Sequence, residues 1–258
     1  PAIHLDLKTT TSGLKMGETE DKSGYVIFGI KDKTLKDIVI PKEIDGKPVK
    51  EIADNAFADC SNLQTLVIPD SIMKVGEKAF INCDNIIEAR IPAHAISAIP
   101  KEKLQKVVIT SGTEIPNGAF SGCETLTNVH IGDTVKKIGK SAFEGCSGLT
   151  SVVIPDSVTS IGDYAFSGCS GLTSITIPFV GATKDGTGNA KHFGWIFGAS
   201  DYSSNSNYVP SSLKEVIITG GNSIGNSAFY GCGELTSIEI PDSVTSIDNS
   251  AFYACVNL

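Results

Sequence analysis

Seven cysteines are the residues of this sequence whose type and spacing suggest chemistry most directly, since thiolates bind metals, form disulfides and attack electrophiles. Each follows a phenylalanine by three positions in the string Ala-Phe-x-x-Cys: Cys60, Cys83, Cys123, Cys146, Cys169, Cys232 and Cys255. There is no Cys-x-x-Cys pair, and cysteines at one position of a repeat form a line rather than a four-ligand metal site. We therefore predict free thiols that pack beside phenylalanine as small apolar side chains. A disulfide between adjacent repeats is the alternative, and it requires suitable Cβ geometry.

The other residues with chemical potential also lack the spacing of a site. The histidines are scattered, without the spacing of metal ligands, at His4, His94, His130 and His192. A calcium ladder and ordinary turn formation are both open for the aspartates at equivalent turns, Asp70, Asp133, Asp156 and Asp242. Gly139-Lys140-Ser141 is like the end of a phosphate loop, but Thr134 stands where that loop needs glycine. We predict no catalytic residue, no cofactor and no metal site, so the protein is not expected to be an enzyme.

The composition of the chain limits the kinds of partner that it is expected to bind. The chain has 258 residues and a formal net charge of −8, with 21 Lys and Arg against 29 Asp and Glu. This acidic balance argues against a nucleic-acid partner and against an anionic membrane surface. No apolar run approaches the ~18 residues of a membrane span, so we predict no membrane insertion. Hydrophobic residues make up 41%, which is enough to bury a core, and we expect a monomer.

A repeat of about 23 residues organises the chain. The Ala-Phe-x-x-Cys string occurs seven times, and four of the six intervals between copies are 23 residues. Most copies are followed by a β-branched triplet such as Val152-Val153-Ile154. A single unit of this size cannot bury its apolar edge alone, so the units have to stack on one another.

The residue types within each repeat predict its strands and turns. The triplets read as short strands, and successive units place them parallel in one sheet. Glycines four residues before a phenylalanine are expected to supply a bend: Gly76, Gly139, Gly162 and Gly225. The Phe-x-x-Cys spacing places both side chains on one face of a short helical turn. We predict an α/β repeat solenoid, a right-handed leucine-rich-repeat coil with one parallel sheet of about nine strands and short helical turns opposite. A plain parallel β-helix is the alternative.

Three segments depart from the regular repeat. The interval from Ile91 to Ile109 is 18 residues and lacks the Phe-x-x-Cys turn, and residues 179–212 form an insertion. Residues 1–23 carry no repeat and are expected to be an N-terminal cap or linker before a first strand at Tyr25–Phe28. The repeat domain is expected to cover residues 24–258.

The repeat resembles a known family. The pattern Ile-Pro-x-Ser-Val-x-x-Ile-Gly-x-x-Ala-Phe-x-x-Cys-x-x-Leu-x-x-Val-x-Ile is similar to the BspA-type leucine-rich repeat, and the stretch from Ile40 to Phe57 is similar to its usual first repeat. The resemblance covers about Gly24 to Leu258. It implies a secreted or cell-surface protein of host-associated bacteria or some protists, often an adhesin for host matrix or other cells. It also implies further domains or anchors and transfers no catalytic residue. Because the last copy stops before its strand, we expect the sequence to be part of a longer protein.

The outward row of the sheet is the first candidate binding surface. The middle residues of the nine triplets are Val39, Val67, Arg90, Val108, His130, Val153, Thr176, Ile217 and Glu239. Five of the nine are aliphatic, which is consistent with a partner surface or with β-propensity alone. The neighbouring row is polar and fits a rim: Asp37, Thr65, Glu88, Lys106, Asn128, Ser151, Ser174, Glu215 and Ser237.

The insertion is the second candidate, because it holds six of the chain's 18 aromatic residues. We predict that Phe193, Ile196 and Phe197 pack in place of the missing turn. We expect Trp195, Tyr202 and Tyr208 to be partly exposed and able to contact a protein or stack on a sugar.

These observations predict a non-catalytic interaction module that binds a protein, such as a host matrix or cell-surface component, or a glycan. A structural spacer and a carbohydrate-recognition part of an enzyme remain alternatives. The candidate contact residues are Arg90, Val108, His130, Val153, Thr176, Trp195, Tyr202 and Tyr208.

Overall fold

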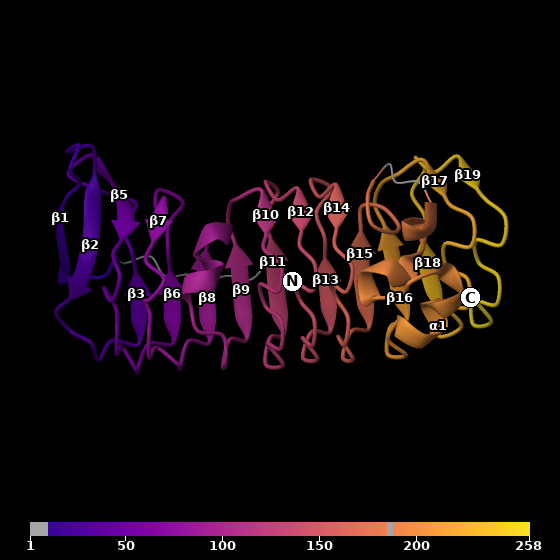
Figure 1. Ribbon diagram of the computed structural model, residues 1–258, viewed down its shortest axis with the longest axis horizontal. Helices are drawn as coiled ribbons and strands as arrows, with labels where there is room; N and C mark the ends of the chain where they lie inside the picture. Colours follow the sequence, from indigo (N-terminus) through magenta and orange to yellow (C-terminus); the bar gives the residue numbers. More distant parts are fainter. Residues whose placement is uncertain (1–9, 185–187) are drawn as a thin grey trace. The chain divides into compact units, whose positions relative to one another are not determined.

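The computed structural model describes residues 10–184 and 188–258, which cluster into two compact units that divide between Gly112 and Thr113. Unit 1 is the part before this division and unit 2 the part after it. The repeat pattern runs through both units, and Figure 1 shows the strands of each unit ordered along the sequence.

Unit 1 begins with an antiparallel hairpin of β1 (Leu14–Glu18) and β2 (Tyr25–Ile30). Strand β2 pairs in parallel with β5 (Lys47–Ile52), which also pairs with β4 (Glu43–Ile44) and β7 (Lys74–Val75). The strand predicted at Tyr25–Phe28 is therefore present and is two residues longer.

The main sheet of unit 1 is built from the predicted triplets. Its parallel strands are β3 (Asp37–Val39), β6 (Thr65–Val67), β8 (Glu88–Ile91) and β9 (Lys106–Ile109). Their inward residues share one register line and are fully buried: Ile38, Leu66, Ala89 and Val107. In the shortened repeat the 3₁₀ helix η1 (Ala93–Ala98) replaces the Phe-x-x-Cys turn and buries Ile96 in the core.

Unit 2 continues the same architecture. Strand β11 (Asn128–Ile131) lies next to β13 (Ser151–Val153), and β13 is followed in a parallel ladder by β15 (Ser174–Ile177), β16 (Glu215–Ile218) and β18 (Ser237–Glu239). A strand is thus present at each of the nine predicted triplets across the two units.

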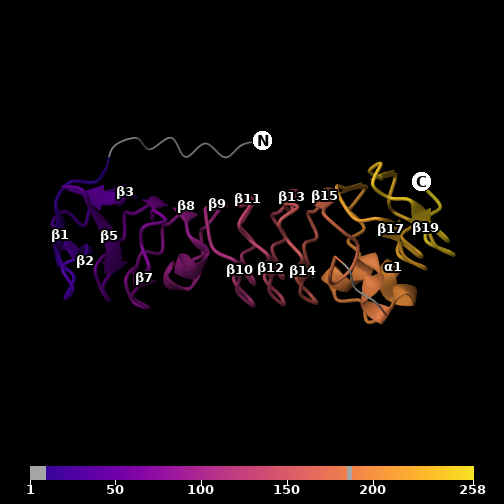
Figure 2. The same cartoon turned by 90° about the horizontal axis from the view of Figure 1, so that it is seen from above.

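A second column of two-residue strands was not predicted. In unit 2 it consists of β10 (Glu114–Ile115), β12 (Lys137–Ile138) and β14 (Ser160–Ile161), and separately of β17 (Ser223–Ile224) and β19 (Ser246–Ile247). Figure 2 shows β10, β12 and β14 on the opposite side of the unit from β11, β13 and β15. Two residues are too few to reveal a period-two pattern in the sequence.

The glycines that follow these short strands have a role that the prediction of a bend did not include. Gly76, Gly139 and Gly162 are absent from the positive-φ residues, so they supply no left-handed bend. Instead, a Cβ added at Gly139 would lie 2.6 Å from the backbone nitrogen of Asn117, and one at Gly162 would lie 2.4 Å from that of Lys140. Glycine is required because the backbones of successive turns of the coil, which we call rungs, approach this closely.

The Ala-Phe-x-x-Cys segments form single hydrogen-bonded turns that stack along the coil. Within a turn the Cys60 amide donates to the Phe57 carbonyl at 3.2 Å, and between rungs the Phe57 amide donates to the Ala79 carbonyl at 2.8 Å. The phenylalanine rings stack in parallel, with centroids 5.1 Å apart for Phe57 and Phe80. This column supplies most of the aromatic core of both units.

All seven cysteines are free, as predicted, and six of them are buried. Their packing is more specific than that of a small apolar side chain. The Cys83 thiol donates to the Phe57 carbonyl at 3.1 Å, and the Cys146 thiol donates to the Phe120 carbonyl at 3.1 Å. Each of these thiols therefore links one rung to the preceding one.

The described part of the insertion folds into short helices, η2 (Gly188–Lys191), η3 (Phe193–Phe197), η4 (Tyr202–Ser204) and α1 (Asn205–Tyr208). The predicted packing of Phe193, Ile196 and Phe197 is confirmed, because all three are buried. The Phe166 amide donates to the Ile196 carbonyl, and the Phe193 amide donates to the Ala228 carbonyl, both at 2.8 Å. The insertion therefore occupies the turn column where a repeat is missing.

Candidate functional site

The outward row of unit 1 offers little continuous surface. Arg90 is exposed, but Val108 is only 3% exposed, so the expectation that it contacts a partner is corrected. Val108 is the in-register neighbour of Arg90 in the parallel ladder. Val39 is also buried. Thr11 lies at the edge of β3, where it forms two hydrogen bonds with the backbone of Val39.

The outward row of unit 2 is more open. Val153 is 61% exposed, His130 is exposed and Thr176 is half-buried. Val153, Thr176, Ile217 and Glu239 are in register across β13, β15, β16 and β18. The adjacent row is polar, and within it the Ser174 hydroxyl donates to the Glu215 carboxylate at 2.9 Å. We call these residues the unit 2 sheet face: His130, Val153, Thr176, Ile217, Glu239, Ser151, Ser174, Glu215 and Ser237.

Trp195 in the insertion has a structural partner. Its Nε1 donates to the carbonyl of Ile161 at 3.2 Å, and the side chain is half-buried, as expected. Tyr202 and Tyr208 are 47% and 44% exposed, which confirms the expected exposure. The Tyr202 ring packs edge-on against Tyr230, with centroids 5.4 Å apart.

The two groups of predicted contact residues do not form one surface. The insertion is bonded to the turn column through Ile196 and Phe193, whereas Val153 and Thr176 lie on the main sheet. Figure 2 shows α1 and the sheet strand β15 on opposite sides of unit 2. A single flat partner surface cannot contact both.

Asn205 is a buried polar residue that sequence reasoning missed. Its Oδ1 accepts from the Gly194 amide at 3.0 Å and lies 2.8 Å from His192 Nδ1. Its Nδ2 donates to the carbonyls of Ala228 and Tyr230 at 3.3 and 3.1 Å. The sequence around Asn205 is a polar serine- and asparagine-rich stretch, so nothing local distinguishes this asparagine from exposed neighbours.

The groups considered for metal or nucleophile chemistry do not converge. Among residues 10–184 and 188–258, no group of three His, Cys, Asp or Glu side chains could hold a metal ion. Burial raises the pKa of the Cys169 thiol to about 12, so it stays protonated at neutral pH. The Asp70 carboxylate accepts a hydrogen bond from Ser111 at 2.7 Å, which fits a role in the turn. His4 lies outside the described residues.

The fold and its exposed faces define a class of protein, the leucine-rich-repeat solenoid, whose members are generally non-catalytic binding modules. No helix within the described part of the chain is long and apolar enough to cross a membrane.

The chain belongs to the family described as BspA type leucine rich repeat region, which matches residues 28–107, 101–184 and 202–258 in six copies. No curated protein matches the chain.

Several solved structures are similar to it. A leucine rich repeat protein of T. pallidum is 24% identical over 97% of this chain and 90% of that chain, with a TM-score of 0.40. A leucine rich cell surface protein of Faecalibacterium prausnitzii is 22% identical over 97% and 93%, with a TM-score of 0.43. A leucine-rich repeat protein of Bacteroides ovatus is 20% identical over 98% and 81%, with a TM-score of 0.37.

Proposed function

We propose that this chain is the binding module of a secreted or cell-surface protein and that it adheres to a protein partner, such as a host matrix or cell-surface component, through the unit 2 sheet face. The observation that supports this most directly is the exposure of Val153 at 61% in the middle of an in-register row of side chains. Protein interfaces have an apolar core surrounded by a polar rim, and Val153 with its polar neighbours fits this arrangement.

The charges of this face favour a basic partner. Glu215 and Glu239 lie on it, and none of its nine residues is Lys or Arg. The whole chain is also acidic, with a net charge of −8. A partner that brings lysine or arginine side chains would associate faster, and the association would weaken as salt screens the charges.

The N-terminal segment is proposed to act as a cap. The hairpin of β1 and β2 and the bonds of Thr11 to Val39 occupy backbone groups at the edge of β3 and β5. Covering a sheet edge prevents pairing with other chains, which is what a repeat array needs at its end.

Surface-immobilised matrix proteins and glycans test the proposed function. Wild-type protein, Val153→Asp and Met73→Asp are compared, since Met73 is also exposed, at 74%, but lies in unit 1. We expect binding to a protein rather than a glycan, at least tenfold weaker in Val153→Asp and unchanged in Met73→Asp. Absence of any partner would favour the spacer function. Glycan binding that Tyr202→Ala abolishes and Val153→Asp leaves intact would move the site to the insertion.

A further inference from the structure

His192, the N-cap residue of η3, has a buried imidazole whose protonation is fixed by its neighbour Asn205. The histidine is 2% exposed, and its Nδ1 lies 2.8 Å from the Oδ1 of Asn205. Asn205 Nδ2 donates to the carbonyls of Ala228 and Tyr230, so Oδ1 faces the imidazole and can only accept. His192 Nδ1 therefore carries the proton, and Nε2 of the neutral imidazole is left as an unprotonated nitrogen.

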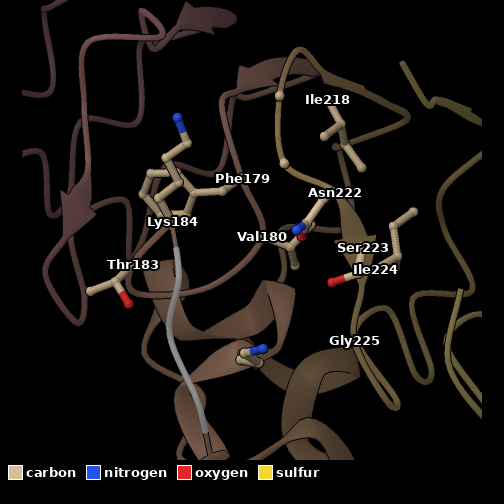
Figure 3. Close-up of a pocket in the computed structure, with 12 residues that line it drawn as sticks. Phe179, Val180, Thr183, Lys184, Ile218, Asn222, Ser223, Ile224 and Gly225 are labelled. Carbon is tan, nitrogen blue, oxygen red and sulfur yellow. The ribbon is translucent and has the colours of Figure 1, made fainter. Parts of the chain in front are cut away.

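This Nε2 is buried and has no hydrogen-bond partner among residues 10–184 and 188–258. A hollow of about 190 Å³ is lined by the preceding residue, Lys191, and Figure 3 shows Phe179, Thr183 and Asn222 around it. His192 is not one of its described lining residues, so this hollow does not bring water to Nε2. A neutral nitrogen here lacks one hydrogen bond, whereas a protonated one would be a buried charge with an unsatisfied donor, which costs more.

The charges around the imidazole do not offset this cost. The Asp201 carboxylate at the start of η4 acts on His192 and favours the protonated form, but burial has the larger effect and lowers the pKa of His192. The other titratable groups on the helices and turns that pack around η3 are cationic or neutral between pH 5 and pH 7.5. They are Tyr164, Lys191, Tyr202, Tyr208, Tyr230 and Cys232.

The insertion can open without breaking the main sheet of unit 2. Strands β15 and β16, which precede and follow the insertion, pair directly with each other through four residue pairs. The bonds that dock the insertion on the turn column include that of the Phe193 amide to the Ala228 carbonyl and those of Asn205 Nδ2. His192 is next to Phe193 in the chain and bonded to Asn205, so a change at its imidazole acts on both groups of docking bonds.

We propose that His192 is an acid-sensitive latch, whose protonation loosens the docking of η3 and α1 on the turn column while the main sheet of unit 2 stays folded. Water solvates the imidazolium in the open form, so the open form binds the proton more readily than the closed form. Opening therefore increases as the pH falls below the ordinary histidine pKa of 6.5, and levels off below the lowered pKa of the closed form. The latch lies on the turn column rather than on the unit 2 sheet face, so it does not depend on the proposed function.

Amide hydrogen exchange of the full chain, followed by NMR at pH 7.5 and pH 5.5 and corrected for intrinsic exchange, tests the latch. We expect the protection of the Phe193 and Val209 amides to fall at least about threefold in acid, and that of the Ser174 and Glu215 amides in the sheet to fall less. The imidazole nitrogen spectrum should show a proton on Nδ1 at pH 7.5. In a pH titration, the loss of protection should follow the protonation of His192.

Three variants separate the latch from general acid sensitivity. His192→Asn keeps a donor near the position of Nδ1 but does not titrate, so the protection of Phe193 and Val209 should be the same at both pH values. Asp201→Asn removes the carboxylate that favours protonation and should move the opening to lower pH. His130→Asn, at an exposed histidine, should keep the wild-type response.

Three results would overturn the proposal. The first is a neutral imidazole that carries its proton on Nε2, and the second is an undiminished acid response in His192→Asn. The third is a loss of protection in the wild-type protein at a pH where His192 is still neutral, and this measurement decides the question even where His192→Asn does not fold.

Discussion

The indole Nε1 of Trp195 donates a hydrogen bond to the carbonyl of Ile161 at a distance of 3.2 Å. In the two preceding rungs the equivalent carbonyls, of Ile115 and Ile138, accept the amides of Gly139 and Gly162. One side chain of the insertion therefore replaces a backbone donor of the missing rung. This relationship explains why a tryptophan occurs at this position without requiring it to contact a partner.

Replacing Trp195 by Phe should lower the free energy of unfolding by about 1–3 kcal/mol, because the half-buried Ile161 carbonyl loses its donor. Urea denaturation followed by circular dichroism measures the change. Tyr202→Phe, which removes only an exposed hydroxyl, is the control and should change little. An unchanged stability in Trp195→Phe together with lost partner binding would instead make Trp195 a contact residue.

Asn205→Ala should lower the free energy of unfolding by more, about 3 kcal/mol, because it removes both a hydrogen-bond donor and an acceptor from a fully buried site. The Ala228 and Tyr230 carbonyls lose their bonds to Nδ2. Asn207→Ala, at an exposed position in the same helix, provides the control. Equal midpoints for the two variants in urea would contradict the central role of Asn205.

Protonation of His192 should destabilise the protein in acid. Burial lowers the pKa of His192 below its ordinary value of 6.5, although the Asn205 hydrogen bond and the nearby Asp201 charge oppose this shift. The unfolded chain then binds a proton more readily than the folded chain, so stability falls as the pH decreases below about 6.5 and levels off once the folded pKa is passed.

His192→Gln removes this titration. The free energy of unfolding of the variant, measured from pH 7.5 to pH 5, should depend less on pH than that of the wild-type protein. His130→Gln, which changes an exposed histidine, should keep the wild-type slope. A wild-type slope in His192→Gln would show that other groups cause the acid sensitivity.

The thiols should titrate in full only after unfolding. Denatured, unreduced protein should present all seven thiols to Ellman's reagent. In the native protein Cys255 should react first, because it is the only one of the seven that is not buried; burial raises the pKa of Cys255 as it raises the pKa of Cys146, Cys169 and Cys232, so access to the reagent decides the order. Cys255→Ser should remove this first phase. Fewer than seven thiols in the denatured chain would indicate a disulfide.

Ala254 is in a backbone conformation that disfavours a side chain. Its φ is 60°, and the equivalent residue before the cysteine is glycine in four other turns: Gly122, Gly145, Gly168 and Gly231. Ala254→Gly should therefore raise the free energy of unfolding by about 1 kcal/mol. Ala58→Gly, at a neighbouring turn position without positive φ, should lower it. Thermal and urea unfolding of the two variants measure these opposite changes in the free energy of unfolding.

The order of the repeats could be predicted because it depends on local spacing. Phe and Cys recur three positions apart, and the triplets alternate with period two, so each unit carries its own burial pattern. Stacking of successive regular units then requires a parallel sheet and a column of stacked phenylalanines. The short second column escaped prediction because strands of two residues, such as β12 and β14, have no readable period.

The sequence by itself thus determined the repeat, the positions of the main strands and the buried Phe and Cys residues. Only the tertiary structure decided which carbonyl Trp195 reaches and that Asn205 is buried among its neighbours. These outcomes depend on contacts between distant residues, such as Trp195 and Ile161, which are 34 positions apart. A missing rung changes the partners of both its neighbours, and no local pattern records which side chain will take its place.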